Sequence, residues 1–166
     1  MDFQQPASSA EPSEGTNSPP RVNIGYRPTL IPTLVDEHRG MVEHLAQVLA
    51  PFERGELSTT GKLLDQFKHE TITHVYKETT QLYLYLQYVL VDRPDEFAQM
   101  RKIRKEMDSI VADTMAFLEK YEALENDRQK QNTFKAEMEA LRDHWLRRVE
   151  TEETLLFPMY QPPVSA

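Results

Sequence analysis

The stretch MRKIRKEMDSIVADTMAFLEKYEAL, residues 100–124, decides the fold class, because its apolar side chains recur with the period of an α-helix. Steps of three and four residues separate Met100, Ile103, Met107, Ile110, Thr114, Phe117, Tyr121 and Leu124. This spacing places them on one face of a helix, while the charged residues between them cover the opposite face. The stretch therefore predicts one long amphipathic helix.

Three further segments carry the same pattern, at residues 33 to about 55, 58–91 and 134–159. Thr33 with Asp36 three residues later gives the first a capping-box-like start. The connections are short, contain Gly or Pro, or are polar as at 125–132. The stripes contain Leu34, Met41, Leu45 and Val48, then Leu64, Phe67, Thr71, Leu82 and Tyr85, and finally Phe134, Met138, Leu141, Trp145, Leu155 and Met159. We expect an all-α, antiparallel up-down-up-down four-helix bundle over residues 29–161.

The two ends of the chain differ from the bundle in composition. Residues 1–28 hold five of the eleven prolines together with Ser, Glu and Gly, so this segment cannot bury enough apolar surface to offset its ordering entropy. We expect a disordered N-terminal tail at 1–28, in which Val22, Ile24 and Tyr26 are candidates for docking, and a short C-terminal tail at 162–166.

Composition excludes several classes of function. The chain of 166 residues carries 27 acidic against 19 basic residues, a net charge of −8 that disfavours binding to a nucleic-acid backbone. It has no cysteine, which removes disulfides and thiolate metal sites. No apolar run approaches the roughly 20 residues of a membrane-spanning helix, and the N-terminus does not resemble a signal peptide. We therefore expect a cytoplasmic protein.

Ionisable residues interrupt the apolar stripes of three helices. They are His38 in the first helix, His74 and Glu78 in the second, and Arg148 and Glu152 in the fourth. Because burying one such group without a partner costs several kcal/mol, they are expected to meet one another, water or a metal ion. A His-x-x-x-Glu pair places an imidazole and a carboxylate on one helix face, a donor set that suits iron, manganese or zinc.

Three motifs in these helices resemble a known family. EHR at 37–39, HVYKETTQLY at 74–83 and RVETEETLLFP at 148–158 are similar to segments of the hemerythrin-like, or HHE cation-binding, domains. The resemblance covers residues 31 to about 160. It implies a four-helix bundle that holds a non-haem iron pair for oxygen binding, sensing or iron handling. On this resemblance His38, His74, Glu78 and Glu152 occupy positions of metal ligands.

Two positions depart from the family pattern. The third helix has Met107, and the fourth has Arg148, where the family offers histidines. A core guanidinium competes with a dication for the same carboxylates. His144, one turn before Arg148, is a possible substitute ligand, whereas His44 and His69 lie off the stripes and are expected at the surface. One iron, two irons and a metal-free ion network all remain open.

A second function class rests on another resemblance. Residues 102–121 and 134–153 resemble the regulator-of-sigma-D family of anti-sigma proteins. This implies a bacterial regulatory protein that binds a sigma factor without metal, and we rank it second. A hydrolytic enzyme ranks third, since the chain shows no nucleophile elbow and no Gly-rich phosphate loop. The stretch YLYLQYVLV at 83–91 is expected to be a buried helix end, with a partner or dimer surface as the alternative.

Overall fold

The computed structural model describes residues 24–163, and within this range the chain forms helices and connecting turns without a β-strand. The first long segment is α1 (Leu30–Glu53). The second runs without a break through α2 (Leu57–Lys77), η1 (Glu78–Tyr83) and α3 (Leu84–Val89). The third is α4 (Pro94–Lys120). After the short η2 (Leu124–Asn126), the fourth joins α5 (Arg128–Thr151) to η3 (Glu152–Leu156) and η4 (Phe157–Met159).

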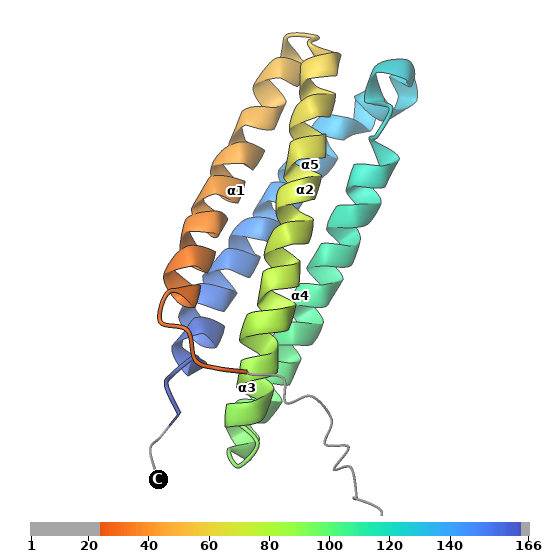
Figure 1. Ribbon diagram of the computed structural model, residues 1–166. Helices are drawn as coiled ribbons and strands as arrows, with labels where there is room; N and C mark the ends of the chain where they lie inside the picture. The colour runs from red at the N-terminus through yellow and green to blue at the C-terminus, as the bar shows by residue number, and fades with distance from the viewer. Residues whose placement is uncertain (1–23, 164–166) are drawn as a thin grey trace, which may run out of the picture.

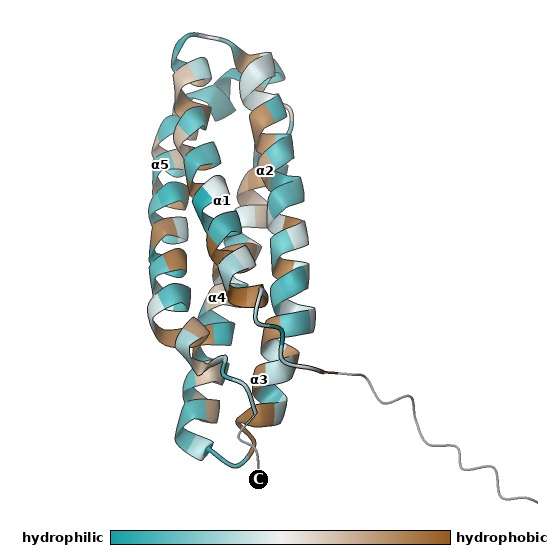
Figure 2. Ribbon diagram, turned by 60° about the vertical axis from the view of Figure 1, so that its left-hand side comes forward, coloured by the Kyte–Doolittle hydropathy of each residue, from teal (hydrophilic) through white to brown (hydrophobic). Residues whose placement is uncertain are grey.

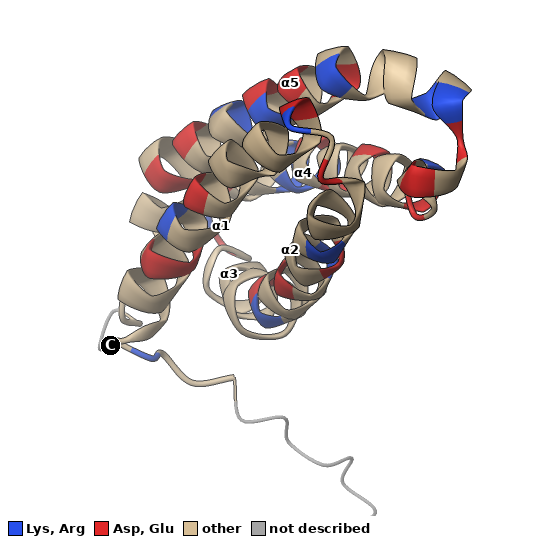
Figure 3. Ribbon diagram, turned by 90° about the horizontal axis from the view of Figure 1, so that it is seen from above, with Lys and Arg blue, Asp and Glu red and all other residues tan. Residues whose placement is uncertain are grey.

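The four segments pack as an antiparallel bundle (Figure 1). Helix α1 lies beside α2 and α5, and α4 lies beside the same two helices. Successive segments alternate in direction, which confirms the expected all-α, up-down-up-down arrangement. None of the helices in residues 24–163 combines the length and the apolar character that a membrane span requires. Lys, Arg, Asp and Glu are spread over all four segments (Figure 3).

A polar layer divides the bundle core into two apolar clusters. In each of three helices, the ionisable residues lie between a member of one cluster and a member of the other. Leu34 and Met41 flank His38, Phe67 and Leu82 flank His74 and Glu78, and Trp145 and Leu156 flank Arg148 and Glu152. Each fully buried Leu or Phe contributes roughly 1.5–3 kcal/mol, so the two clusters supply the free energy that holds this layer away from water. The alternating colours along each helix in Figure 2 show the amphipathic pattern behind this packing.

Two predicted helix starts were wrong. Helix α1 begins at Leu30, before Thr33, and the hydroxyl of Thr33 donates to the carbonyl oxygen of Thr29 (2.8 Å) instead of capping the helix. Helix α5 begins at Arg128, inside the segment predicted to be a polar connection. The side chain of Asp127 accepts hydrogen bonds from the backbone N–H groups of Gln129 (3.0 Å) and Lys130 (3.1 Å), so it is an N-cap.

Replacing Asp127 with Ala is expected to lower the free energy of unfolding by about 1 kcal/mol, because two backbone N–H groups of α5 lose their acceptor. Urea unfolding followed by circular dichroism measures the change. Asp127→Asn, which keeps a capping oxygen, should retain most of the stability. An equal loss in both variants would show that the cap does not stabilise α5.

Both glutamates of the polar layer begin a π-helical segment. Glu78 opens η1 and Glu152 opens η3, at the same point of the two helices relative to the layer. A π turn widens the helix locally and occurs frequently at functional sites. Beyond η1, the expected burial of residues 83–91 was wrong in part, since Tyr88 and Val91 are each 68% exposed although Leu86 and Leu90 are buried.

The start of the described chain lies against one end of the bundle. The ring of Tyr26 stacks on that of Tyr160, with 5.0 Å between ring centroids, and the backbone N–H of Arg27 donates to the Tyr160 hydroxyl (2.9 Å). Residues 24–28, which the sequence assigned to the tail, are therefore in contact with the bundle. The remainder of the predicted tails, 1–23 and 164–166, lies outside the described residues.

Candidate metal centre

Three helices bring five ionisable side chains together in the polar layer. His38 comes from α1, His74 and Glu78 from the second helix at the α2–η1 junction, and Arg148 and Glu152 from the fourth at the α5–η3 junction. None of the five is more than 1% exposed. Four-residue spacing across the α2–η1 and α5–η3 junctions places both members of each pair on one inward face. The convergence that the sequence predicted for these five residues is therefore present.

The two imidazoles face one oxygen of each carboxylate. The Nε2 atom of His38 lies 2.9 Å from Oε2 of Glu152 and 3.9 Å from Oε1 of Glu78. The Nε2 atom of His74 lies 3.1 Å from the same Oε1 of Glu78. These four donor atoms all lie within 4.8 Å of one another, and they form a possible metal-binding group in the described part of the chain.

The other oxygen of each carboxylate is bound to Arg148. Its Nη2 atom donates to Oε2 of Glu78 (2.5 Å), and its Nε atom donates to Oε1 of Glu152 (2.8 Å). The guanidinium also lies 4.9 Å from the ring centroid of Trp145, which supports its position by a cation–π contact. Arg148 thus bridges the two glutamates from one side, while the imidazoles approach them from the other.

Two glutamates that the sequence analysis did not assign hold the outer nitrogens of the imidazoles. The Nδ1 atom of His38 lies 2.9 Å from Oε1 of Glu153, and the Nδ1 atom of His74 lies 2.8 Å from Oε2 of Glu37. An ionised carboxylate can only accept, so each Nδ1 carries the proton of its hydrogen bond, and in the neutral form of the ring Nε2 would present a lone pair inward. Each of these glutamates is the sequence neighbour of a predicted ligand, His38 or Glu152, which is the signal that could have found them.

The inward donor atoms fit a single cation. Nε2 of both histidines, Oε1 of Glu78 and Oε2 of Glu152 are buried and have no hydrogen-bond partner among the described residues. Lone pairs that face one another in a dry site repel unless a positive charge lies between them. Around an octahedral cation with donors at roughly 2.0–2.2 Å, adjacent donors lie about 3 Å apart and opposite donors about 4 Å apart. The separations of 2.9, 3.1 and 3.9 Å match that range, whereas the group as a whole extends to 4.8 Å.

The charges of the side chains around the two histidines also fit one divalent cation. Glu37, Glu78, Glu152 and Glu153 bring four negative charges to the imidazoles. Arg148 neutralises one, and Lys77, which is bound to Glu37, neutralises a second. With neutral imidazoles, the remaining two negative charges equal the charge of one divalent metal ion. The donor set and its charge therefore fit a mononuclear dication.

The pKa values of the two inner carboxyls move apart. Burial alone would raise the pKa of Glu78, but the neighbouring imidazole of His74 and the charge of Arg148 lower it below its usual range. Burial, and then the charge of Glu78, raise the pKa of Glu152, and Arg148 offsets this only in part. One guanidinium thus offsets the effect of burial on Glu152 only in part, and a further positive charge would stabilise its ionised form.

The third helix and the remaining histidines lie outside this group. Met107 is packed in an apolar cluster, and His144 borders a cavity of about 340 Å³ between α4 and α5, so neither supplies one of the four donors. His69 is exposed, as expected. The expected surface position of His44 was wrong, because it is 7% exposed and its Nδ1 atom lies 3.0 Å from Oε2 of Glu70.

A comparison with family models identifies the domain. The model described as the hemerythrin HHE cation-binding domain matches residues 29–160, which include the four helices and every residue of the site. Comparisons with curated proteins and with solved structures gave no match. The bundle, its buried His–Glu cluster and this match over most of the chain agree. The chain therefore belongs to the hemerythrin HHE cation-binding domain family.

Proposed function

We propose that this protein binds one non-haem iron ion through His38, His74, Glu78 and Glu152 and acts in oxygen or redox sensing, or in iron handling. The observation that carries the proposal is the set of four buried donor atoms that face one another without hydrogen-bond partners. Two imidazole nitrogens with two carboxylate oxygens suit iron, and iron in such a site would supply one-electron redox chemistry and affinity for oxygen.

Arg148 explains why one ion is proposed instead of two. Its guanidinium binds the carboxylate oxygens that face away from the histidines, so each glutamate has one oxygen left for a metal. The protein groups would have separate tasks. The imidazoles and two carboxylate oxygens bind the ion, Glu37 and Glu153 fix the tautomers and orientations of the rings, and the apolar clusters on both sides exclude water.

The direct test is iron reconstitution. Purified protein stripped with a chelator should take up ferrous iron under anaerobic conditions, and elemental analysis after desalting should find bound iron. Protein that stays free of iron at micromolar concentrations of the ion would refute the proposal. Zinc and manganese in parallel samples establish which ion the site prefers.

The outer glutamates should tune the affinity of the site. Glu37→Gln and Glu153→Gln keep the size of the side chain but remove the charge that orients a histidine, so each should weaken metal binding roughly 10–100-fold. Competition with a chelator of known affinity measures the change, and a substitution at an exposed glutamate, Glu119→Gln, serves as the control. Wild-type affinity in both variants would mean that these hydrogen bonds do not position the rings.

A metal-free regulatory protein is the second candidate, and one observation favours it. Arg148 already joins both inner glutamates, so protonation of one imidazole would close the ion network without a metal. In this case a protein partner such as a sigma factor would bind equally well with and without chelator. A pull-down with the primary sigma factor, made in both conditions, separates the two candidates.

A further inference from the structure

Three cavities open at the surface between different pairs of helices, and two of them reach the polar layer. The cavity between α1 and α2, of about 420 Å³, is bordered by His74 and its partner Glu37. The cavity between α1 and α5, of about 460 Å³, is bordered by His38 and its partner Glu153. The third, between α4 and α5, reaches Met107. The first two each lead to a histidine of the proposed site.

The charges that border these cavities differ. Glu37 and Glu70 border the α1–α2 cavity together with His69, and its described lining contains neither Lys nor Arg. Arg39 borders the α1–α5 cavity beside Glu43 and Glu153, and Arg147 borders the third beside Glu106 and Asp113. A concave surface lined by one sign of charge concentrates counter-ions and raises their association rate. All three linings are acidic, but the α1–α2 cavity differs from the other two because its described lining has no Lys or Arg to repel an approaching cation.

A glycine in the wall keeps this cavity open. Gly40 lies in the interior of α1, where glycine costs roughly 0.5–1 kcal/mol relative to alanine. Its backbone does not need glycine, because Gly55 is the residue with positive φ in the described chain. Packing does not need it either, since a Cβ added at Gly40 would meet no atom within 4 Å. Because glycine has no side chain, position 40 leaves space in the cavity.

We propose that the metal ion reaches the site through the α1–α2 cavity, guided by Glu70 and admitted by the space at Gly40. Glu37 links the two ends of this route, because it borders the cavity and is hydrogen-bonded to His74. The inference rests on the proposed metal-binding function and adds the path by which the ion is loaded and released.

Loading kinetics test the route. Metal-free protein is mixed with ferrous iron in an anaerobic stopped-flow instrument, and binding is followed by the fluorescence of Trp145, the sole tryptophan, which lies against Arg148. Gly40→Phe fills the α1–α2 cavity. The association rate should fall on the order of tenfold, because the ion must wait for a local opening of the helix pair. Equilibrium affinity should be unchanged, since the plug slows loading and release equally.

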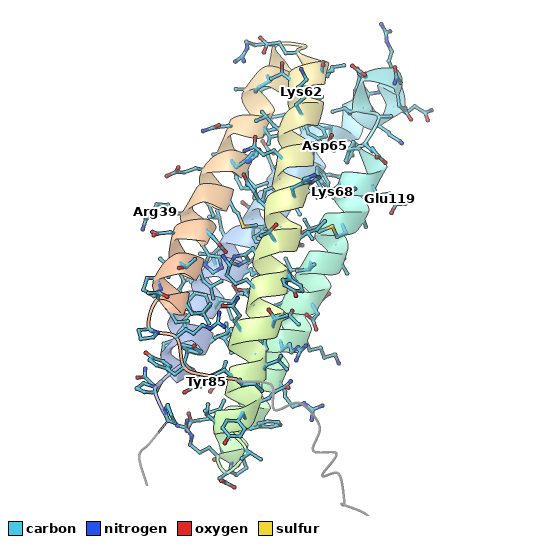
Figure 4. All side chains as sticks on the ribbon, in the orientation of Figure 1. Arg39, Lys62, Asp65, Lys68, Tyr85 and Glu119 are labelled. Atoms are coloured by element: carbon cyan, nitrogen blue, oxygen red, sulfur yellow. The ribbon has the colours of Figure 1, made fainter. Side chains whose placement is uncertain are left out.

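Matched variants complete the experiment. Gly40→Ala controls for the change in helix propensity and should load at the wild-type rate. Arg39→Phe places the same ring at the α1–α5 cavity and should also leave the rate unchanged; Arg39 extends away from α1 in Figure 4. Glu70→Gln should slow loading at low salt and lose this effect at high salt.

The outcomes separate the route from the function on which it rests. The route would be overturned if Gly40→Phe bound iron at the wild-type rate, or if Arg39→Phe, and not Gly40→Phe, bound it slowly. Neither result would contradict metal binding itself. If the wild-type protein held no iron at equilibrium, both the route and the proposed metal-binding function would be refuted. An unchanged melting curve for metal-free Gly40→Phe excludes misfolding as the cause of slow loading.

Discussion

Metal-free protein carrying Arg148→Met is expected to be less stable than the wild type by about 3–5 kcal/mol, because two buried carboxylates lose the cation that bridges them. The loss is a large fraction of the roughly 5–15 kcal/mol that stabilises a typical domain. With metal bound, the same substitution should cost much less, since the ion compensates the charge and the two carboxylates become more available to it. Denaturant unfolding with and without chelator measures both values.

The neighbouring arginine is the matched control. Arg147 is exposed and belongs to the same helix, so Arg147→Met should change stability little in either condition. An Arg148→Met protein that is equally destabilised with and without iron would show that the metal does not share its charge compensation with the guanidinium. A metal-free Arg148→Met protein as stable as the wild type would contradict the buried ion network itself.

Glu78→Gln is expected to release the metal. The substitution keeps the shape of the side chain but removes the charge of a residue whose Oε1 atom lies 3.1 Å from Nε2 of His74 and 3.9 Å from Nε2 of His38. The loss of affinity should exceed the roughly 10–100-fold expected for the outer glutamates, because a proposed ligand is changed directly. Iron content after gel filtration and chelator competition measure the effect.

The control for this variant is a glutamate far from the layer. Glu119 lies on the outside of α4, where Figure 4 labels it, and Glu119→Gln should retain the wild-type iron content. Unchanged iron content in Glu78→Gln would contradict the proposed ligand set. Circular dichroism of the metal-free variants accompanies the iron analysis. An unchanged spectrum shows that lost iron is due to the altered site and not to an unfolded bundle.

The bundle and the polar layer were predictable because both depend on periodicity. Apolar residues every three or four positions define the inward face of each helix, and an ionisable residue in that row must enter the core with the others. The spacing of residues within each single helix is sufficient for this prediction. It placed His38, His74, Glu78, Arg148 and Glu152 in one layer, and the structure confirms their convergence.

The outer glutamates were not predictable in this way. Glu37 and Glu153 lie beside the apolar stripes, and each reaches the histidine of another helix. Their role depends on the distance between two helices, which the spacing within one helix does not contain. The same reason applies to His44, whose burial depends on Glu70 of α2. The π turns at Glu78 and Glu152 likewise have no signal in an apolar repeat.

The amount of iron bound per chain tests the central claim most directly. Reconstituted wild-type protein, freed of loosely bound ions by gel filtration, is analysed for iron by elemental analysis and for protein by amino-acid analysis. A mononuclear site with Arg148 in place of a second cation predicts one iron per chain. Two irons per chain would contradict the role given to Arg148, and a protein without iron would contradict the metal site.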